Sequence, residues 1–461
     1  MTRRMPTGSA GLDAILGGGL VTPSITLLAG VPGTGKTVLA QQVAFANGHP
    51  DAPVVYLSTL TEPLTKITQF VQGLAFCDPD RIGAEVVFED IGDLVVTGGL
   101  RKGLERITDI LTHTPGAVLV VDSIKALRFA ARNATEYVRF LYELAGRLSA
   151  LSTSSLWLAE YDLAELTASP EYAIGDSTVV LSTHTTGQRT NRALQVLKHR
   201  GSGSLSGWHA YRITERGLDV FPRLSDVGRM TEWQGDTTRV SSGIPALDTM
   251  LNDGYWPGSS TMVAGPPGSG KTVLGLYFVY RGAELGEKCT FTTLEENQVQ
   301  LGRAVRSLGW DPQDDNIVLR CESPNDIYID QWYYELVDSL KATGCRRLVI
   351  DSLTALATAC DDDPQRFSEF IRSLLSRCAQ AGISTMLTLD VPDLYSRHRL
   401  PQLGIAHLSD NLILLHYVRD GTRMDRAMTV LKSRANKNQP DSRRFVITPK
   451  GIVIDDPVTG P

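Results

Sequence analysis

The chain has 461 residues, of which 42% are apolar and 21% charged, and its formal net charge is −6. This composition excludes a disordered, fibrous or coiled-coil protein, and at about 150 residues per domain the length suggests two large domains or about three smaller ones. The acidic balance argues against a protein that mainly coats nucleic acid or an anionic membrane, because such surfaces carry a basic excess.

We expect a cytoplasmic protein without a signal peptide or a membrane span. No apolar run approaches about 18 residues, and Asp13 and several glycines interrupt the start of the chain. The six cysteines form no CxxC pair and have no histidine at a metal-ligand spacing. They are therefore expected to be buried free thiols rather than disulfides or zinc ligands.

The sequence repeats itself. GVPGTGKTVL from Gly30 recurs as GPPGSGKTVL from Gly265, about 235 residues later. GLDAILGGGL, VVDSIKAL and VLKHR recur in the same order as ALDTMLNDGY, VIDSLTAL and VLKSR. The repeat predicts a duplicated domain, with a first copy at 1–225, a polar linker at 226–238 and a second copy at 239–461.

Within each half, short apolar runs alternate with longer amphipathic stretches. Apolar runs of strand length lie at 24–30, 53–59, 117–123, 155–161 and 178–183 in the first half, and at 260–265, 289–294, 347–352, 384–390 and 411–418 in the second. The stretches 134–151 and 364–382 place apolar residues three and four apart, which indicates helices. The alternation predicts an α/β fold in each half, with a mostly parallel sheet between helices.

Both halves contain the pattern G-x-x-x-x-G-K-[ST] between a strand-like run and a helix-like stretch. Its glycines let backbone N–H groups surround phosphate oxygens, its lysine reaches the β- and γ-phosphates, and its hydroxyl binds Mg²⁺. We therefore predict two nucleoside triphosphate sites with Mg²⁺. The predicted binding residues are Gly30, Gly33, Thr34, Gly35, Lys36, Thr37, Gly265, Gly268, Ser269, Gly270, Lys271 and Thr272.

A site of this type also needs an acid at the end of a neighbouring strand to hold the water shell of the metal. Asp122 and Asp351 each end an apolar run and are each followed by serine. The sequence therefore predicts one metal site at Thr37 and Asp122, and a second at Thr272 and Asp351.

Carboxylates near the end of the second strand are the predicted catalytic groups, because they could polarise an attacking water or hydroxyl. The second half has Glu295 and Glu296 in TTLEEN, whereas the aligned STLTEP of the first half has Thr61 and Glu62. We expect the second half to carry most turnover. The first half, with Glu62 alone, should be a slow and largely structural ATP holder.

Late in each half, strand alternation puts Lys198 with Arg200, and Lys432 with Arg434, on one face of a strand. A solvated edge strand would show the same pattern. Phosphoryl transfer, however, gains most from a cation brought to the γ-phosphate from outside the loop, often by an adjacent subunit.

Over essentially the whole chain, these motifs resemble the KaiC family of RecA-like ATPases in its double-domain form. The match rests on TGSAGLDAILGGGL and its echo SSGIPALDTML, both phosphate loops, LEE at 294–296, VDS, IDS and the Lys-x-Arg strands. The resemblance implies two tandem RecA-like P-loop NTPase domains and a homo-hexamer of two stacked rings, with ATP between neighbouring subunits. It also implies that Glu295 and Glu296 are the catalytic acids of the second ring, and that both Lys-x-Arg pairs contact the ATP of the adjacent subunit.

Three features depart from the family's pattern. The adjacent Ser and Thr that the family phosphorylates are Ala406 and His407 here, and Ser409 is the hydroxyl that remains nearby. The leading glutamate of the first-domain pair is Thr61, and the sequence ends at Pro461, soon after the last strand, so we expect no long regulatory tail. These departures favour a KaiC-like ATPase over a clock-type autokinase.

We therefore expect a hexameric ATPase that acts in signalling or regulation with a signalling protein as partner. Three alternatives stay open: a KaiC-type Ser/Thr autokinase of a circadian-like timing system that uses Ser409 or another hydroxyl, a RecA/Rad-like DNA-dependent ATPase, and a nucleotide-binding scaffold without turnover. The basic stretches at 185–192 and around Arg399 lack interleaved aromatics, which argues against nucleic acid as the partner.

Overall fold

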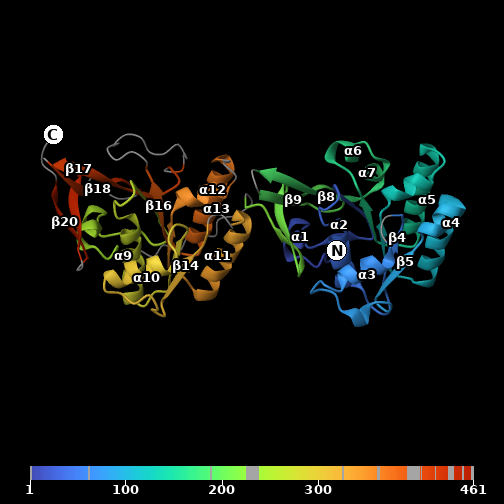
Figure 1. Cartoon of the computed structure of the whole chain (residues 1–461), viewed down its shortest axis with the longest axis horizontal. Helices are drawn as coiled ribbons and strands as arrows, with labels where there is room; N and C mark the ends of the chain where they lie inside the picture. Colours follow the sequence, from blue (N-terminus) through green and yellow to red (C-terminus); the bar gives the residue numbers. More distant parts are fainter. Residues whose placement is uncertain are drawn as a thin grey trace. The chain divides into compact units, whose positions relative to one another are not determined.

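The computed structural model divides into two compact units, Met1–Arg223 and Leu224–Pro461, which we describe separately (Figure 1). The structure describes residues 3–60, 63–186, 189–224, 238–323, 327–360, 364–391, 405, 407–420, 422–434, 441–448 and 451–457. Residues 226–237 of the predicted linker lie outside this set. Within the described residues, no helix has the length and apolar character needed to cross a membrane.

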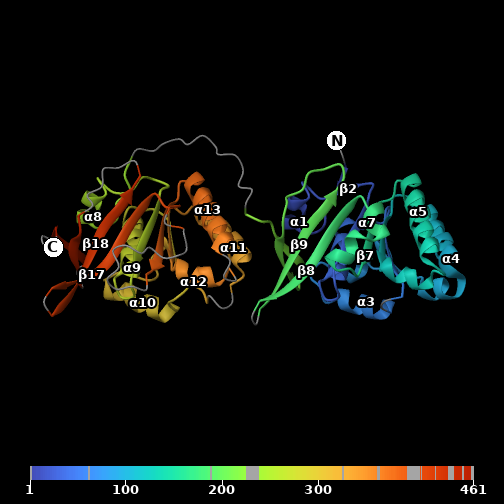
Figure 2. The same cartoon turned by 90° about the horizontal axis from the view of Figure 1, so that it is seen from above.

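The first unit contains a nine-stranded sheet with helices on both faces, and a small two-stranded sheet (Figures 1 and 2). Its strands are β1 Arg3–Met5, β2 Leu20–Thr22, β3 Ile25–Ala29, β4 Val54–Ser58, β5 Val86–Asp90, β6 Val118–Asp122, β7 Ser155–Ala159, β8 Ser177–Thr186, β9 Arg189–His199, β10 His209–Thr214 and β11 Gly217–Phe221. Its helices are α1 Ala10–Ile15, α2 Lys36–Asn47, α3 Leu64–Val71, η1 Pro79–Arg81, α4 Gly92–His113, η2 Lys125–Ala130, α5 Ala134–Ala150, α6 Leu163–Thr167 and α7 Pro170–Ile174.

The large sheet of the first unit has the strand order β11-β10-β9-β8-β3-β7-β6-β4-β5. The strands from β5 to β8 in this order run parallel, and β9, β10 and β11 are antiparallel additions at one side. The carboxyl ends of the parallel strands therefore meet at one edge of the sheet. In open α/β sheets this edge is where ligands bind.

Both faces of the parallel strands are buried, as their unbroken apolar runs predict. On β3, Leu27 packs in one apolar cluster with α4 and α5, and the next residue, Leu28, packs in the other with α1 and α2. Leu141 of α5 and Leu39 of α2 are each fully buried on their side of the sheet. Two apolar layers thus hold the strand ends in fixed positions.

The second unit has the same architecture (Figure 2). Its strands are β12 Ser260–Gly265, β13 Cys289–Thr293, β14 Ile317–Cys321, β15 Arg347–Asp351, β16 Ser384–Asp390, β17 Asn411–Asp420, β18 Arg423–Ser433, β19 Arg443–Thr448 and β20 Gly451–Pro457. Its helices are α8 Pro245–Met250, α9 Lys271–Glu284, α10 Gln298–Ser307, α11 Ile329–Thr343, α12 Leu353–Thr358 and α13 Pro364–Gln380. The order β14-β13-β15-β16-β12-β17-β18-β19-β20 repeats that of the first unit strand for strand. This confirms the predicted fold class of two mostly parallel sheets flanked by helices.

A buried arginine ties together three segments of the second unit. The Arg347 side chain, at the start of β15, is 1% exposed and pairs with Glu287 at 2.6 Å. Its Nη1 donates to the carbonyl oxygens of Ser241 at 2.7 Å and Phe278 at 2.9 Å. The arginine thus hydrogen-bonds to two backbone carbonyl oxygens, one in the segment before α8 and one in α9.

Candidate active site

Each phosphate loop joins the central strand of its sheet to the helix that follows, β3 to α2 in the first unit and β12 to α9 in the second. Gly33 and Gly35 have φ angles of 82° and 88°, and Gly268 and Gly270 have φ angles of 74° and 105°. Residues with a Cβ rarely adopt this left-handed conformation, so the loop path itself requires glycine at these positions.

Both loop lysines are buried and fold back onto their own loops. Lys36 Nζ donates to the carbonyl oxygens of Gly30 at 2.8 Å and Val31 at 3.1 Å, and Lys271 Nζ makes the two equivalent contacts at 3.0 and 3.1 Å. Burial lowers the pKa of Lys36, and the nearby negative charges of Glu160 and Asp122 oppose this shift. Each ammonium is therefore held against the concave backbone of its loop.

The helices behind the loops begin without side-chain caps. α2 and α9 have Gly35 and Gly270 as N-cap residues, and neither cap supplies a side-chain hydrogen bond. The first N–H groups of a helix have no intrahelical partner and lie at the positive end of its dipole. Uncapped N–H groups, left-handed glycines and a buried lysine together fit a phosphate group in each unit.

The predicted metal-binding residues lie in contact with each other. Thr37 Oγ1 donates to Asp122 Oδ2 at 3.0 Å, and Thr272 Oγ1 donates to Asp351 Oδ2 at 2.7 Å. Hydroxyl and carboxylate oxygens suit Mg²⁺, which keeps several waters and takes further ligands from phosphates. The donor sets thus fit this ion, and the described residues contain no cluster of three or more His, Cys, Asp or Glu side chains that could hold a metal alone.

The two aspartates are held by hydroxyls from different strands. Tyr56 Oη on β4 donates to Asp122 Oδ2 at 2.7 Å, whereas Thr388 Oγ1 on β16 donates to Asp351 Oδ1. Burial raises the pKa of Asp351, and the hydrogen bonds from Thr388 and Thr272 oppose that rise. Neither supporting hydroxyl could be predicted from the motifs, because each comes from a strand position outside them.

In the second unit, a chain of polar contacts links the phosphate loop to Glu295. Lys271 Nζ lies 2.8 Å from Asp390 Oδ1, the Asp390 carboxyl interacts with that of Glu295, and Ser352 Oγ donates to Glu295 Oε1. Burial would raise the pKa of Asp390, but the hydrogen bond and charge of Lys271 hold it below its ordinary value. Burial and the Asp390 charge raise the pKa of Glu295. Asp390, which the sequence analysis did not select, thus connects the loop lysine to a predicted catalytic acid.

Glu296 keeps an unused acceptor. Burial and the charge of Asp351 raise its pKa, and its Oε2 atom is buried without a hydrogen-bond partner in the described part of the chain. A carboxylate oxygen in this state is available to a water molecule or to a proton from one.

The two units have the same backbone register at the end of the second strand. Ser58 pairs with Asp122 in the first unit, and Thr293 pairs with Asp351 in the second. In each unit the next residue donates its N–H to the carbonyl oxygen of the aspartate, at 3.0 and 2.7 Å. Because these pairings are equivalent in the two units, the residues that follow can be matched by their backbone position rather than by similarity of residue type.

Counted from this point, Leu60 corresponds to Glu295 and Thr61 to Glu296, one residue away from the letter match of STLTEP with TTLEEN. Leu60 is 37% exposed. Thr61 and Glu62 lie outside the described residues. By this count, Leu60 has the backbone position in the first unit that Glu295 has in the second.

The Lys-x-Arg pairs lie at the opposite edge of each sheet from the phosphate loops. Lys198 pairs with Thr178 at the start of β8, and Lys432 pairs with Leu412 at the start of β17. Each loop, by contrast, follows the carboxyl end of the neighbouring central strand. The structure therefore does not bring either pair to the loop of its own unit.

Each basic pair is held by its own domain in this structure. Lys198 Nζ donates to the carbonyl oxygens of Tyr172 at 3.2 Å and Ala173 at 3.3 Å, and Arg200 lies 3.4 Å from Asp176. Burial lowers the pKa of Lys198, and the charge of Arg200 adds to this effect.

Lys432 Nζ donates to the carbonyl oxygen of Ser409 at 2.5 Å. Arg434 Nη2 donates to the carbonyl oxygen of His407 at 3.1 Å, and its Nη1 lies 3.6 Å from Asp410 Oδ1. The same kind of contact thus recurs in both units, with the cations resting on the segment that enters β8 or β17.

The fold and the site define a tandem pair of RecA-like P-loop NTPase domains. A family model described as the KaiC ATPase matches residues 5–225 and 240–459. The chain belongs to the KaiC ATPase family, which confirms the resemblance inferred from the motifs.

Curated relatives match nearly the whole chain. The circadian clock oscillator protein KaiC of Picosynechococcus sp. is 28% identical over 472 residues, which cover 97% of this chain and 88% of the relative. KaiC of Rippkaea orientalis is 28% identical, with 98% of this chain and 89% of the relative covered. KaiC 1 of Synechocystis sp. is 27% identical, with 98% of this chain and 89% of the relative covered.

Proposed function

We propose that the protein is a hexameric ATPase that binds Mg·ATP between neighbouring subunits, hydrolyses it mainly in the second domain and serves a signalling or regulatory role. Membership of the KaiC ATPase family supports nucleotide hydrolysis in general. The hexamer, the shared sites and the division of labour are the proposal.

The observation that carries the proposal is that the phosphate loop and the Lys-x-Arg pair of each unit lie at opposite edges of the sheet. The phosphate loop, its threonine and the strand-end aspartate lie at the carboxyl edge of the sheet, and the Lys-x-Arg pair lies at the amino edge. A cation outside the loop is a large contributor to phosphoryl transfer. A chain of this design obtains that cation from a neighbouring copy.

Within one subunit, the loop backbone and Lys271 bind the phosphates, and Thr272 with Asp351 holds the metal ion and its waters. Bound Mg²⁺ neutralises charge on the β- and γ-phosphates. Glu295 and Glu296 orient the attacking water and accept its proton. The first domain has Leu60 at the position of Glu295, so we propose that it mainly holds ATP.

The autokinase alternative receives less support from the region ahead of β17. His407 carries no hydroxyl, Ser409 is fully buried, and Ala406 lies outside the described residues. The relatives' names concern a circadian clock oscillator. For this chain we propose a regulatory ATPase without stoichiometric self-phosphorylation.

Mass measurement combined with a phosphate-release assay tests the proposal. With Mg·ATP, the full chain should assemble into particles of six subunits and release phosphate, and Lys271→Ala should weaken ATP binding and abolish turnover from the second domain. A chain that stays monomeric at saturating Mg·ATP would refute shared sites. An assembled ring without phosphate release would refute the enzyme and leave a nucleotide-binding scaffold.

A further inference from the structure

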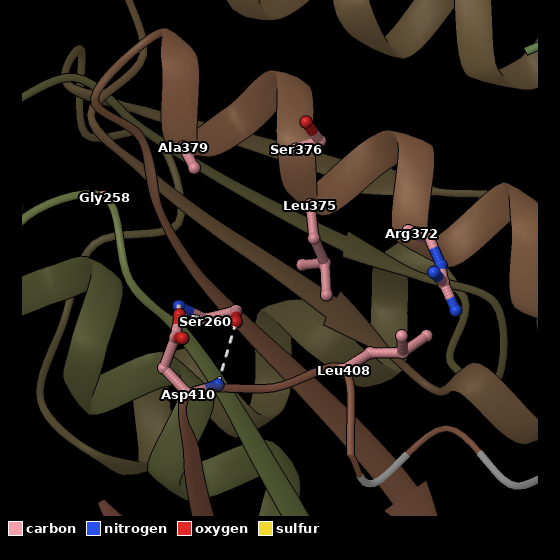
Figure 3. Close-up of a pocket in the computed structure, with 8 residues that line it drawn as sticks. All are labelled: Gly258, Ser260, Arg372, Leu375, Ser376, Ala379, Leu408 and Asp410. Carbon is pink, nitrogen blue, oxygen red and sulfur yellow. Dashed lines mark hydrogen bonds between the residues drawn. The ribbon is translucent and has the colours of Figure 1, made fainter. Parts of the chain in front are cut away.

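A cavity of about 180 Å³ lies at the amino edge of the second unit's sheet, between α13 and the starts of β12 and β17 (Figure 3). Leu375 of α13 and Leu408 give it apolar walls, and Ser260 and Asp410 line the opposite side. Arg372 of α13 stands at its rim, with its side chain on the same side of the helix as Leu375 and directed toward Leu408 (Figure 3).

The charge of Arg372 is not neutralised by Asp410 across the cavity. Asp410 Oδ2 accepts hydrogen bonds from the N–H and the hydroxyl of Ser260, both at 2.9 Å, and its Oδ1 lies 3.6 Å from Arg434. Arg372 is exposed and makes no hydrogen bond or ion pair within the described residues. Among the described residues of the second unit, Arg372 is therefore a cation without an acidic partner, beside a carboxylate that is already engaged.

Arg372 stands over the same segment that the Lys-x-Arg pair holds. Lys432 and Arg434 donate to the carbonyl oxygens of Ser409 and His407, and Leu408 between them lines the cavity below Arg372. Two cations thus contact this segment at the amino edge of the sheet, and the third, Arg372, lines the same cavity as Leu408. Two of them form the pair proposed to meet the ATP of a neighbouring copy.

The first unit lacks this third cation. Gly382 after α13 and Ser152 after α5 have matching left-handed φ angles of 68° and 52°, and each leads into the next strand of its sheet. Counted back from these residues, Arg372 corresponds to Tyr142, which is 62% exposed. The extra cation therefore occurs in the unit that also has the two glutamates.

We propose that Arg372 is a third trans-acting cation that contacts the γ-phosphate of the ATP held by the neighbouring second domain. This inference rests on the proposed function. In the reaction, the water oxygen bonds to the γ-phosphorus, the bond to the bridging oxygen breaks, ADP leaves, and the water's proton passes to a carboxylate. Arg372 stabilises the negative charge on the phosphoryl oxygens during this step.

The test compares Arg372→Gln and Arg372→Lys with Arg303→Gln in the full chain. Arg303 is an exposed arginine of α10 without a hydrogen bond or ion pair in the described part of the chain, so it controls for the loss of one surface charge. Phosphate release is measured as a function of ATP concentration, and assembly and thermal unfolding are measured in parallel.

Arg372→Gln should lower kcat about 10- to 100-fold, as expected for one charge-assisted contact, with little change in KM, assembly or unfolding temperature. Arg372→Lys should retain part of the rate, and Arg303→Gln should match the wild type. A wild-type rate in Arg372→Gln, or a loss explained by failed assembly, would refute the role of Arg372 alone. A wild-type chain that neither assembles nor releases phosphate would refute the proposed function.

Discussion

Replacing both acids of the second domain, in the double variant Glu295→Gln and Glu296→Gln, should remove most phosphate release. A general base contributes about 10²- to 10⁴-fold, which is roughly 3 to 5 kcal/mol of barrier. ATP binding and assembly should survive, because the change removes negative charge next to the Lys271–Asp390 pair rather than a contact to the phosphates. The double variant keeps the phosphate release of the first domain. If the first domain turns over at about one hundredth of the rate of the second, the variant keeps about 1% of the wild-type rate.

The matched control is Glu62→Gln, which makes the same chemical change in the first domain. Counted from the backbone register of the second strand, Leu60 has the position of Glu295 in the second domain, so we expect Glu62→Gln to change turnover little. Steady-state phosphate release, with assembly checked by mass, gives the comparison. Loss of most activity in Glu62→Gln, or retention of more than about half of it in the double variant, would refute the assignment of the second domain as the catalytic one.

Four further outcomes follow from the described contacts. Burial raises the pKa of Glu296. When the pH is lowered, turnover should therefore begin to fall at a higher pH than for an ordinary glutamate, whose pKa is about 4.3. A pH–rate profile that is flat down to about pH 4 would contradict this. Lys432→Ala should lower the rate of phosphate release per assembled particle, and an unchanged rate would argue against a trans contact. Incubation with γ-labelled ATP should leave the chain essentially unlabelled, and stoichiometric labelling would support the autokinase hypothesis instead. Arg347→Leu removes a side chain that is 1% exposed and should cost the second domain about 3 to 5 kcal/mol in urea unfolding, whereas a cost below about 1 kcal/mol would show that the domain tolerates its loss.

The local parts of the site could be predicted from the sequence because their chemistry lies in contiguous residues. The glycines and lysine of each loop, and the aspartate at each strand end, carry their function within a few neighbouring positions. The structure places Thr37 against Asp122, and Thr272 against Asp351.

The nonlocal parts could not be predicted in this way. Asp390 and Thr388 reach the site from β16, and Tyr56 reaches Asp122 from β4. Which strand supplies a supporting hydroxyl depends on strand order, and no short motif encodes that order. The backbone register at the ends of β4 and β13 differs by one residue from the match of STLTEP with TTLEEN, and Thr61 and Glu62 lie outside the described residues.

The placement of the cations has a consequence for symmetry. A surface that donates a cation and a surface that receives it lie at opposite edges of each sheet, so the proposed contact joins two different faces of the chain. Such a head-to-tail interface cannot form a two-fold dimer, and repeating it gives either a closed ring or an open filament. In any open chain of subunits, the terminal copy would hold a nucleotide that no neighbour completes. Closing the ring would therefore complete the last nucleotide site. A subunit that lacks its cations would inactivate the site of the neighbouring copy, whereas its own site would stay active.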